Sequence, residues 1–161
     1  MARSQAPYAP PSVAWKMFLS FLRGAMLIVR CEGRPLSLVL YGESRTGKTL
    51  WARSLGSHIY NVGLVSGTEC MKGTHVEYAI FDDIRGGMKF FPAFKEWLGA
   101  QAWVSVKCLY RDPVLMKWGK PSIWISNDDP RHVMEPSYVS WLEANAMFIE
   151  IREPIFRANT E

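Results

Sequence analysis

Four short hydrophobic runs recur along the chain. They are LSLVLY at 36–41, VEYAIF at 76–81, SIWIS at 122–126 and MFIEI at 147–151. Continuous apolar runs of this length are typical of strands that are buried on both faces, as in a parallel sheet covered by helices. The pattern therefore predicts a mainly parallel central sheet.

Segments with helical character separate these runs. They are TLWARSLG at 49–56, FFPAFKEWLG at 90–99 and SYVSWLEANA at 137–146. Gly56 is placed to end the first segment, and Pro92 lies near the first turn of the second, where proline is tolerated. The alternation of strands and helices predicts an α/β fold, a three-layer sandwich with the sheet in the middle.

Residues 103–121 interrupt the alternation, and their pattern predicts a projecting β-hairpin with a basic tip. Cationic and aromatic side chains are interleaved in this segment: Lys107, Tyr110, Arg111, Lys117, Trp118 and Lys120. Such a mixture suits single-stranded nucleic acid, because charges attract phosphates and rings stack on bases. A solvated basic loop with two packed aromatic residues explains the pattern equally well.

The chain before residue 35 has a different character. Its first dozen residues are rich in proline, which predicts an extended tail, and residues 14–29 predict a helix that packs on the main domain. The apolar stretch 17–29 is too short to span a membrane. We therefore divide the chain into an N-terminal tail and helical segment, 1–34, and one α/β domain, 35–161.

Composition limits the class of protein. The chain has 161 residues, of which 48% are hydrophobic and 21% charged, which is typical of one soluble domain and excludes a disordered tail or a multi-domain enzyme. The net charge of +4 permits a partner with phosphates without requiring one. Three dispersed cysteines with no CxxC pair argue against a disulfide framework or a structural zinc site, so we expect a soluble intracellular protein.

The strongest chemical signal is GESRTGKT, which matches G-x-x-x-x-G-K-[ST] between an apolar strand and a helix. In that motif the glycines let the backbone wrap a phosphate, the lysine reaches the β- and γ-phosphates of ATP, and the final hydroxyl binds Mg²⁺. A chance glycine-rich turn is the alternative, and the strand–loop–helix setting disfavours it. The predicted nucleotide-binding residues are Gly42, Glu43, Ser44, Arg45, Thr46, Gly47, Lys48 and Thr49.

Polar residues follow two other predicted strands. In YAIFDDI we expect Asp82 to hold Mg²⁺, with Thr49, and Asp83 to act as the general base for the attacking water. In IWISN the strand ends in Asn127, whose amide is then placed near the γ-phosphate. Taken alone, an acidic turn and a turn-forming asparagine also account for these residues.

Together, GESRTGKTLWARSLG, YAIFDDI, FKEWLGAQ, KWGKP and IWISN resemble the helicase part of the replication-associated (Rep) proteins of small circular single-stranded DNA viruses, geminiviruses and genomoviruses in particular. The resemblance extends from about residue 34 to the C-terminus, where WLEANAMFIEIREPIF is similar to the end of that module. It implies a P-loop NTPase fold and a superfamily 3 helicase of the AAA+ type, an ATPase that works as a ring on single-stranded DNA.

The resemblance also implies roles for single residues. It makes the loop 42–49 the Walker A motif, Asp82 and Asp83 the Walker B pair, and Asn127 the motif C sensor. Lys117 falls where the family has a DNA-contacting lysine at the hairpin tip. This favours DNA binding by the hairpin, with Lys107 and Lys120 as further contacts, over a merely solvated loop.

An arginine finger is expected at the subunit boundary of such a ring, because charge in the transition state needs a cation. Arg131, just past the sensor, is the predicted finger, and Arg111 and Arg152 are alternatives. A surface arginine in a turn also accounts for Arg131.

The chain departs from the family at its N-terminus. Family members have an endonuclease domain with a His-x-His pair and a nicking tyrosine, and no His-x-His pair occurs here. We therefore expect no nicking or ligation from this chain. We interpret it as a helicase-only piece: a separate reading frame, a truncated gene or a copy integrated into a host genome.

The leading hypothesis is a Mg²⁺-dependent ATPase that drives helicase movement in rolling-circle replication. The resemblance implies a homo-oligomer in the host nucleus, with host replication proteins as further candidate partners and no membrane. One alternative is a nucleotide- and DNA-binding remnant or oligomerisation module of a truncated Rep, which the intact pair of acids disfavours. Another is a small P-loop kinase, which needs an arginine-rich lid where a hairpin with tryptophan and lysine is found.

Overall fold

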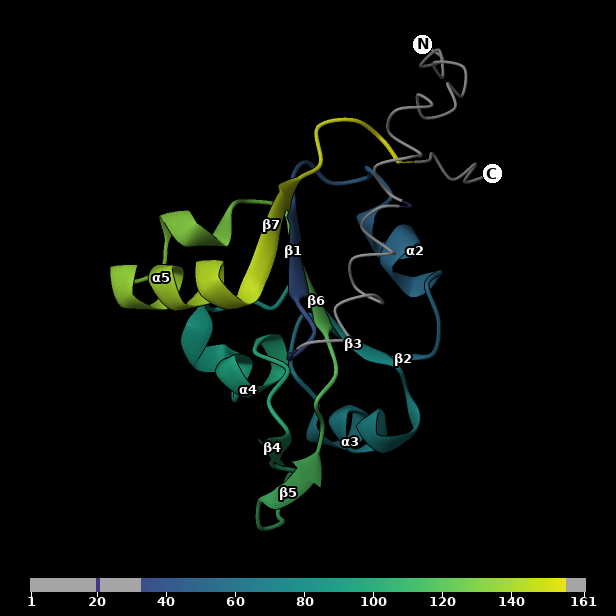
Figure 1. Ribbon diagram of the computed structural model, residues 1–161, viewed down its shortest axis with the longest axis vertical. Coiled ribbons are helices and arrows are strands. Elements are labelled where there is room, and N and C mark those ends of the chain that lie inside the picture. The colour runs from purple at the N-terminus through teal and green to yellow at the C-terminus, as the bar shows by residue number, and fades with distance from the viewer. Residues whose placement is uncertain (1–19, 21–32, 156–161) are drawn as a thin grey trace.

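A five-stranded sheet forms the centre of the computed structural model, which describes residue 20 and residues 33–155 (Figure 1). In spatial order the strands are β2 (His58–Val62), β3 (Tyr78–Asp82), β6 (Ser122–Ser126), β1 (Ser37–Tyr41) and β7 (Ala146–Glu150). Every neighbouring pair is parallel, so the carboxyl ends of all the strands lie at one edge of the sheet. The predicted parallel sheet is confirmed.

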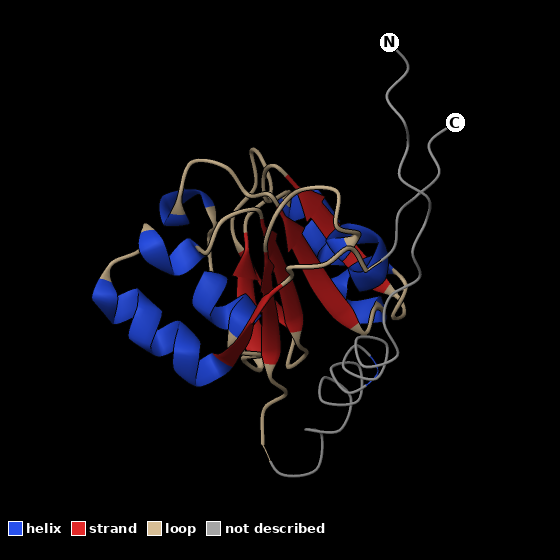
Figure 2. Ribbon diagram, turned by 90° about the horizontal axis from the view of Figure 1, so that it is seen from above, coloured by secondary structure: helices blue, strands red, loops and turns tan. Residues whose placement is uncertain are grey.

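Helices cover both faces of this sheet (Figure 2). Helix α2 packs on one face, and α4 and α5 pack on the other. The bounds are α2 (Lys48–Arg53), α3 (Gly67–Cys70), α4 (Phe94–Leu98) and α5 (Pro136–Asn145), with 3-10 helices η1 (Met71–His75), η2 (Met88–Phe90) and η3 (Pro130–His132). The α/β class predicted from the alternation of elements is confirmed.

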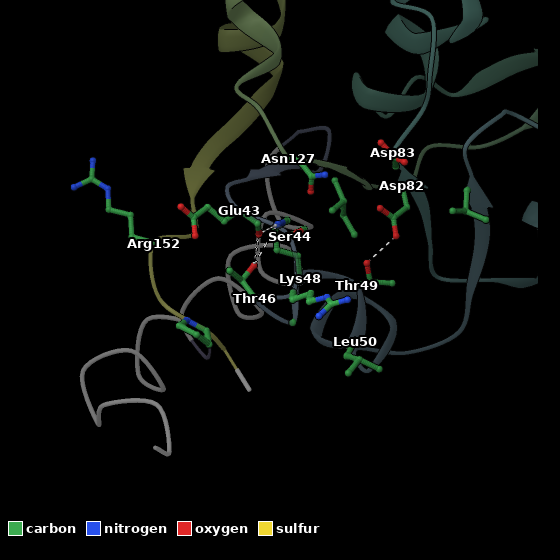
Figure 3. Close-up of a pocket in the computed structure, with 15 residues that line it drawn as sticks. Glu43, Ser44, Thr46, Lys48, Thr49, Leu50, Asp82, Asp83, Asn127 and Arg152 are labelled. Atoms are coloured by element: carbon green, nitrogen blue, oxygen red, sulfur yellow. Dashed lines mark hydrogen bonds between the residues drawn. The ribbon is translucent and has the colours of Figure 1, made fainter. Parts of the chain in front are cut away.

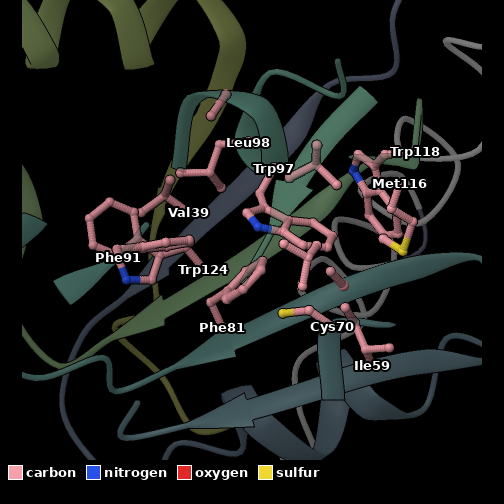
Figure 4. Packing of buried hydrophobic residues seen from close by; sticks show 14 of the residues in the cluster. Val39, Ile59, Cys70, Phe81, Phe91, Trp97, Leu98, Met116, Trp118 and Trp124 are labelled. Carbon is pink, nitrogen blue, oxygen red and sulfur yellow. The ribbon is translucent and has the colours of Figure 1, made fainter. Parts of the chain in front are cut away.

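Strand side chains alternate between two cores, because successive residues of a strand point to opposite faces. Leu38 and Leu40 pack with Trp51 of α2, whereas Val39 packs in the other core with Trp97 of α4. Figure 4 shows the latter core, where large aromatic side chains pack together: Phe81, Phe91, Trp97, Trp118 and Trp124. The same alternation decides which polar side chains share a face at the ends of the strands.

Strands β4 (Trp103–Val106) and β5 (Val114–Lys117) form the predicted antiparallel hairpin, separate from the main sheet. Val104 and Met116 are buried on its inner face. These side chains belong to the same buried cluster as Trp97, so apolar contacts anchor the hairpin to the core, and its other face is exposed. In Figure 1 the hairpin lies at the lower end of the molecule.

Strand β2 is the element that the hydrophobic pattern does not predict. HIYNV has no continuous apolar run, since Ile59 and Asn61 are buried while their neighbours are partly or fully exposed. This alternation is typical of a strand at the edge of a sheet, which β2 is. Its bounds between Gly56 and Gly63 are the signal that could have found it.

Two helices are shorter than predicted. Helix α2 ends at Arg53 instead of Gly56, because the Ser54 hydroxyl donates to a carbonyl oxygen of the last turn at 2.7 Å. Helix α4 begins at Phe94, because the residue before it has a left-handed φ of 57°. Pro92 therefore precedes the helix instead of opening it.

The predicted N-terminal tail and helix, residues 1–34, lie almost entirely outside the described residues. Among the helices that the structure does describe, none is long and apolar enough to cross a membrane.

Candidate functional site

The carboxyl ends of β1, β3 and β6 open into a cavity of about 890 Å³ (Figure 3). Residues 43–50, from the loop after β1 and the first turn of α2, line one side. Asp82, Asp83 and Asn127 line the cavity from the ends of β3 and β6. This edge of an open α/β sheet is where ligands bind. The structure therefore brings together the loop, both acids and the asparagine that the sequence singled out.

The side chain of Lys48 is buried at the base of this loop. Its ammonium donates to the carbonyl oxygens of Gly42 at 2.8 Å and Glu43 at 2.6 Å, and to the Thr46 hydroxyl at 3.2 Å. Burial lowers the pKa of Lys48, and the negative charge of Asp82 opposes that effect. Oxygen atoms of the loop thus hold the Lys48 ammonium at the floor of the cavity.

The two glycines of the loop serve different purposes. Gly47 has a left-handed φ of 86°, and this conformation starts α2. Gly42 has a φ of 141°, and a Cβ there would overlap the carbonyl oxygen of Ile151, in the segment that follows β7. The same segment bonds to the loop through the Ile155 amide, which donates to the carbonyl of Thr46 at 2.7 Å. Close packing of the chain's own backbone therefore already requires glycine at residue 42.

One carboxylate oxygen of Asp82 accepts two hydrogen bonds. The Thr49 hydroxyl donates to Oδ2 at 2.7 Å, and the Tyr60 hydroxyl donates to the same atom at 2.8 Å. Burial raises the pKa of Tyr60 to about 12, and its hydrogen bond to Asp82 acts in the same direction. Tyr60 belongs to β2, so the sequence pattern missed it together with that strand.

The oxygen atoms of Asp82 and Thr49 fit Mg²⁺ better than they fit a metal ion whose ligands all come from protein. Mg²⁺ binds through one or two carboxylates completed by water and phosphate oxygens, and Asp82 with Thr49 offers such a partial set. In the described part of the chain, no three His, Cys, Asp or Glu side chains gather as a possible metal site. Asp82 and Thr49 therefore fit Mg²⁺ as part of its ligand set and not as the whole of it.

Asp83 has a left-handed backbone, with φ of 50°. Its amide donates to the carbonyl of Ile125 at 3.0 Å, which ties the end of β3 to β6. Its carboxylate is 56% exposed and lies 3.5 Å from the Arg85 Nε. Strained backbone of this kind is concentrated at functional sites. Here the carboxylates of the consecutive residues Asp82 and Asp83 point in different directions, and only that of Asp82 contacts Thr49 (Figure 3).

The other side of the cavity is formed by β6 and by the segment after β7. The carbonyl of Asn127 accepts from the Gly42 amide at 3.2 Å, so the end of β6 is tied to the start of the loop. Arg152 and Pro154 also line the cavity, and the Arg152 guanidinium is paired with Glu150 at 2.8 Å. The sequence offered Arg152 only as an alternative finger and gave no signal for Pro154.

Arg131 does not line this cavity. Its guanidinium is paired with Asp129 at 2.8 Å and Glu143 at 3.2 Å, and it stacks 4.3 Å from the centre of the Phe148 ring. These contacts connect η3 with α5 and β7, which is a structural role within the described chain. The finger toward a neighbouring copy stays a prediction.

The expected position of Lys117 at the hairpin tip is wrong. The β4–β5 register pairs Lys117 with Trp103 at the base of the hairpin, and the tip is formed by residues 107–113. Lys117, Trp103 and Leu115 are all exposed on the outer face. The sequence did not identify Trp103 as a candidate contact.

Two residues that follow the hairpin, Trp118 and Lys120, also differ from expectation. The Lys120 ammonium donates to the carbonyl of Gly73 at 2.6 Å, and its burial lowers the pKa of Lys120. Trp118 is buried against Trp97, with ring centroids 4.6 Å apart, so its ring is not presented to a ligand. Lys107, in contrast, is exposed at the tip as predicted.

Sequence comparison identifies a relative of this chain. Over 150 residues it is 34% identical to the replication-associated protein of cabbage leaf curl virus (isolate Jamaica). The chain is a relative of a viral replication-associated protein. The match covers 86% of this chain and 42% of that protein, so the chain spans less than half the length of the Rep protein. No protein-family model matches the chain.

Proposed function

We propose that this chain is the ATP-hydrolysing part of a Rep-like protein and drives helicase movement on single-stranded DNA during viral rolling-circle replication. The observation that carries the proposal is the convergence of the loop 42–49, the buried Lys48 and the acids Asp82 and Asp83 on one cavity. The similarity to a viral Rep protein supports a role in viral replication.

In the proposed site, ATP binding replaces hydrogen bonds that Lys48 makes within the loop 42–49 by contacts with the phosphates. The Lys48 ammonium leaves the carbonyls of Gly42 and Glu43 and pairs with the β- and γ-phosphates. Thr49 and Asp82 would hold a Mg²⁺ ion that accompanies the nucleotide. That ion supplies neutralisation of phosphate charge.

The two remaining polar groups, Asp83 and Asn127, are proposed to act near the γ-phosphate. Water attacks the γ-phosphorus, the bond to the bridging oxygen of ADP breaks, and Asp83 accepts the proton of the water. The Asp83 carboxylate is free for this role because its one ion pair among the described residues, with Arg85, is long and exposed. The Asn127 amide senses the γ-phosphate.

Replacing Asp83 by asparagine is expected to lower ATP hydrolysis by about 100-fold or more, because loss of a general base typically costs that much. Binding of ADP should be unchanged, since Asp83 does not hold the metal in this proposal. Phosphate release and binding of a fluorescent ADP analogue measure the two effects. Asp112→Asn, at the hairpin tip, is the matched control, and hydrolysis by Asp83→Asn equal to that control would contradict the role.

The outer face of the hairpin is the proposed contact with single-stranded DNA. Trp103 offers an exposed ring opposite Lys117, so a base can stack beside a cation that pairs with a phosphate. Lys107 adds a second exposed cation at the tip. Lys120 is already bound to the carbonyl of Gly73 and contributes only if that contact opens.

Replacing Lys117 by alanine should weaken single-stranded DNA binding for every sequence, because a phosphate contact carries no base preference. The slope of log affinity against log salt should fall by about 1. Fluorescence anisotropy with a labelled oligonucleotide at several salt concentrations measures both. Lys89→Ala removes an exposed lysine outside the hairpin, and an equal effect of the two variants would show that only net charge matters.

Assembly and place of action are part of the same proposal. We propose a homo-oligomeric ring in the host nucleus, with host replication proteins as partners, as in the proteins that the motifs resemble. To act as a finger, Arg131 must leave Asp129 and Glu143 and reach the phosphates bound by a neighbouring copy.

A further inference from the structure

A tyrosine from the neighbouring strand contacts the carboxylate that is proposed to bind metal. In the β2–β3 register Val62 lies opposite Asp82, and Tyr60 lies opposite Ile80. Tyr60 is therefore the diagonal neighbour of Asp82 on the face covered by α2, within reach of a long side chain. Its hydroxyl donates to Asp82 Oδ2 at 2.8 Å.

The phenol is itself held in place from two sides. The Arg53 guanidinium of α2 lies 4.3 Å from the centre of the Tyr60 ring. The Tyr60 amide donates to Glu69 Oε1 of α3 at 3.1 Å. Contacts to the ring and to the backbone thus fix where the hydroxyl points.

Both hydrogen-bond donors contact the same oxygen of the Asp82 carboxylate. Thr49 and Tyr60 both donate to Oδ2, whereas no described residue donates a hydrogen bond to Oδ1. A carboxylate bound in this way can rotate little without losing a hydrogen bond. Its open oxygen then faces a ligand in a defined direction.

We propose that Tyr60 is a positioning residue for Mg²⁺ binding. Its hydroxyl holds the Asp82 carboxylate so that Oδ1 faces the ion that accompanies the nucleotide. This inference rests on the proposed nucleotide site and adds a residue to it. Tyr60 does not touch the nucleotide or the ion; it acts through Asp82.

Tyr60→Phe tests the inference because it removes the hydroxyl and keeps the ring. Mg²⁺ should strengthen the binding of a fluorescent ADP analogue, and the Mg²⁺ concentration at half of that gain should rise about 10-fold in the variant. A loss of this size is typical when a metal ligand loses its hydrogen-bond partner. ADP binding without Mg²⁺ should be unchanged. The kcat for ATP at saturating Mg²⁺ should fall by less than about 3-fold, because more metal compensates for weaker binding.

Tyr78→Phe is the matched control. Tyr78 lies on the same face, and its hydroxyl donates to the carbonyl of Ala52 instead of to Asp82. This variant should lower the melting temperature and leave the Mg²⁺ dependence unchanged. A second variant, Arg53→Met, keeps the Tyr60 hydroxyl but removes the stacked guanidinium, and it should raise the required Mg²⁺ by a smaller factor.

The outcomes separate this inference from the function on which it rests. An unchanged Mg²⁺ requirement in Tyr60→Phe, or an equal rise in Tyr78→Phe, would overturn the role of Tyr60 while the nucleotide site stands. If the wild-type chain binds ADP with no dependence on Mg²⁺, the proposed site itself fails. A rise confined to Tyr60→Phe and Arg53→Met supports the inference.

Discussion

Lys48→Ala is expected to lower ATP hydrolysis by at least about 100-fold, because it removes the buried cation that would stabilise charge on the phosphates. The ammonium is held by oxygens of the loop itself, at 2.6 and 2.8 Å from two carbonyls. Its loss therefore removes both the charge and a contact that shapes the loop. Phosphate release under saturating ATP and Mg²⁺ measures the effect.

The control for Lys48→Ala must separate lost chemistry from lost folding. Lys89→Ala removes an exposed lysine away from the cavity and should keep full hydrolysis. Circular dichroism should show the same secondary structure in both variants, because the hydrogen bonds of the sheet do not involve the Lys48 side chain. Hydrolysis by Lys48→Ala at the wild-type rate would contradict the assignment of the cavity.

Gly42→Ala is expected to lower the free energy of unfolding by about 4 kcal/mol, a large part of the stability of a domain this size. The φ of 141° strains any residue with a Cβ, and that Cβ would overlap the Ile151 carbonyl oxygen and lie 3.1 Å from its carbon. Because both atoms belong to backbone, no side-chain rotation relieves the overlap. Urea unfolding followed by circular dichroism measures the loss.

Gly33→Ala provides the comparison for Gly42→Ala. Gly33 has a similar φ of 134°, but no atom of the described residues lies within 4 Å of a Cβ there. It should therefore lose only the cost of backbone strain, about 1–3 kcal/mol. Equal losses in the two variants would mean that the close packing of the loop 42–49 against Ile151 contributes nothing to stability.

The sequence alone located most of the candidate site, because local features determine it. Apolar runs identified β1, β3 and β6, and polar residues directly after such strands must meet at one edge of a parallel sheet. Local pattern alone therefore places Asp82, Asp83 and Asn127 beside the loop 42–49.

Residues positioned by pairing between distant segments were missed or misplaced. Tyr60 depends on β2, an edge strand without a continuous apolar run, and on its register with β3. The position of Lys117 depends on where the hairpin turns, since the turn at residues 107–113 places Lys117 at the base opposite Trp103. Trp118 follows β5, and its burial depends on packing against Trp97 of α4. Arg131 depends on the carboxylate of Asp129, directly before η3, and on that of Glu143 in α5, which no local pattern connects to it.

Mg²⁺-dependent ATP hydrolysis by the wild-type chain, measured with and without a single-stranded oligonucleotide, tests the central claim most directly. The proposed function predicts turnover that requires Mg²⁺, rises when the oligonucleotide is added and disappears in Lys48→Ala. Nucleotide binding without turnover under either condition would contradict it.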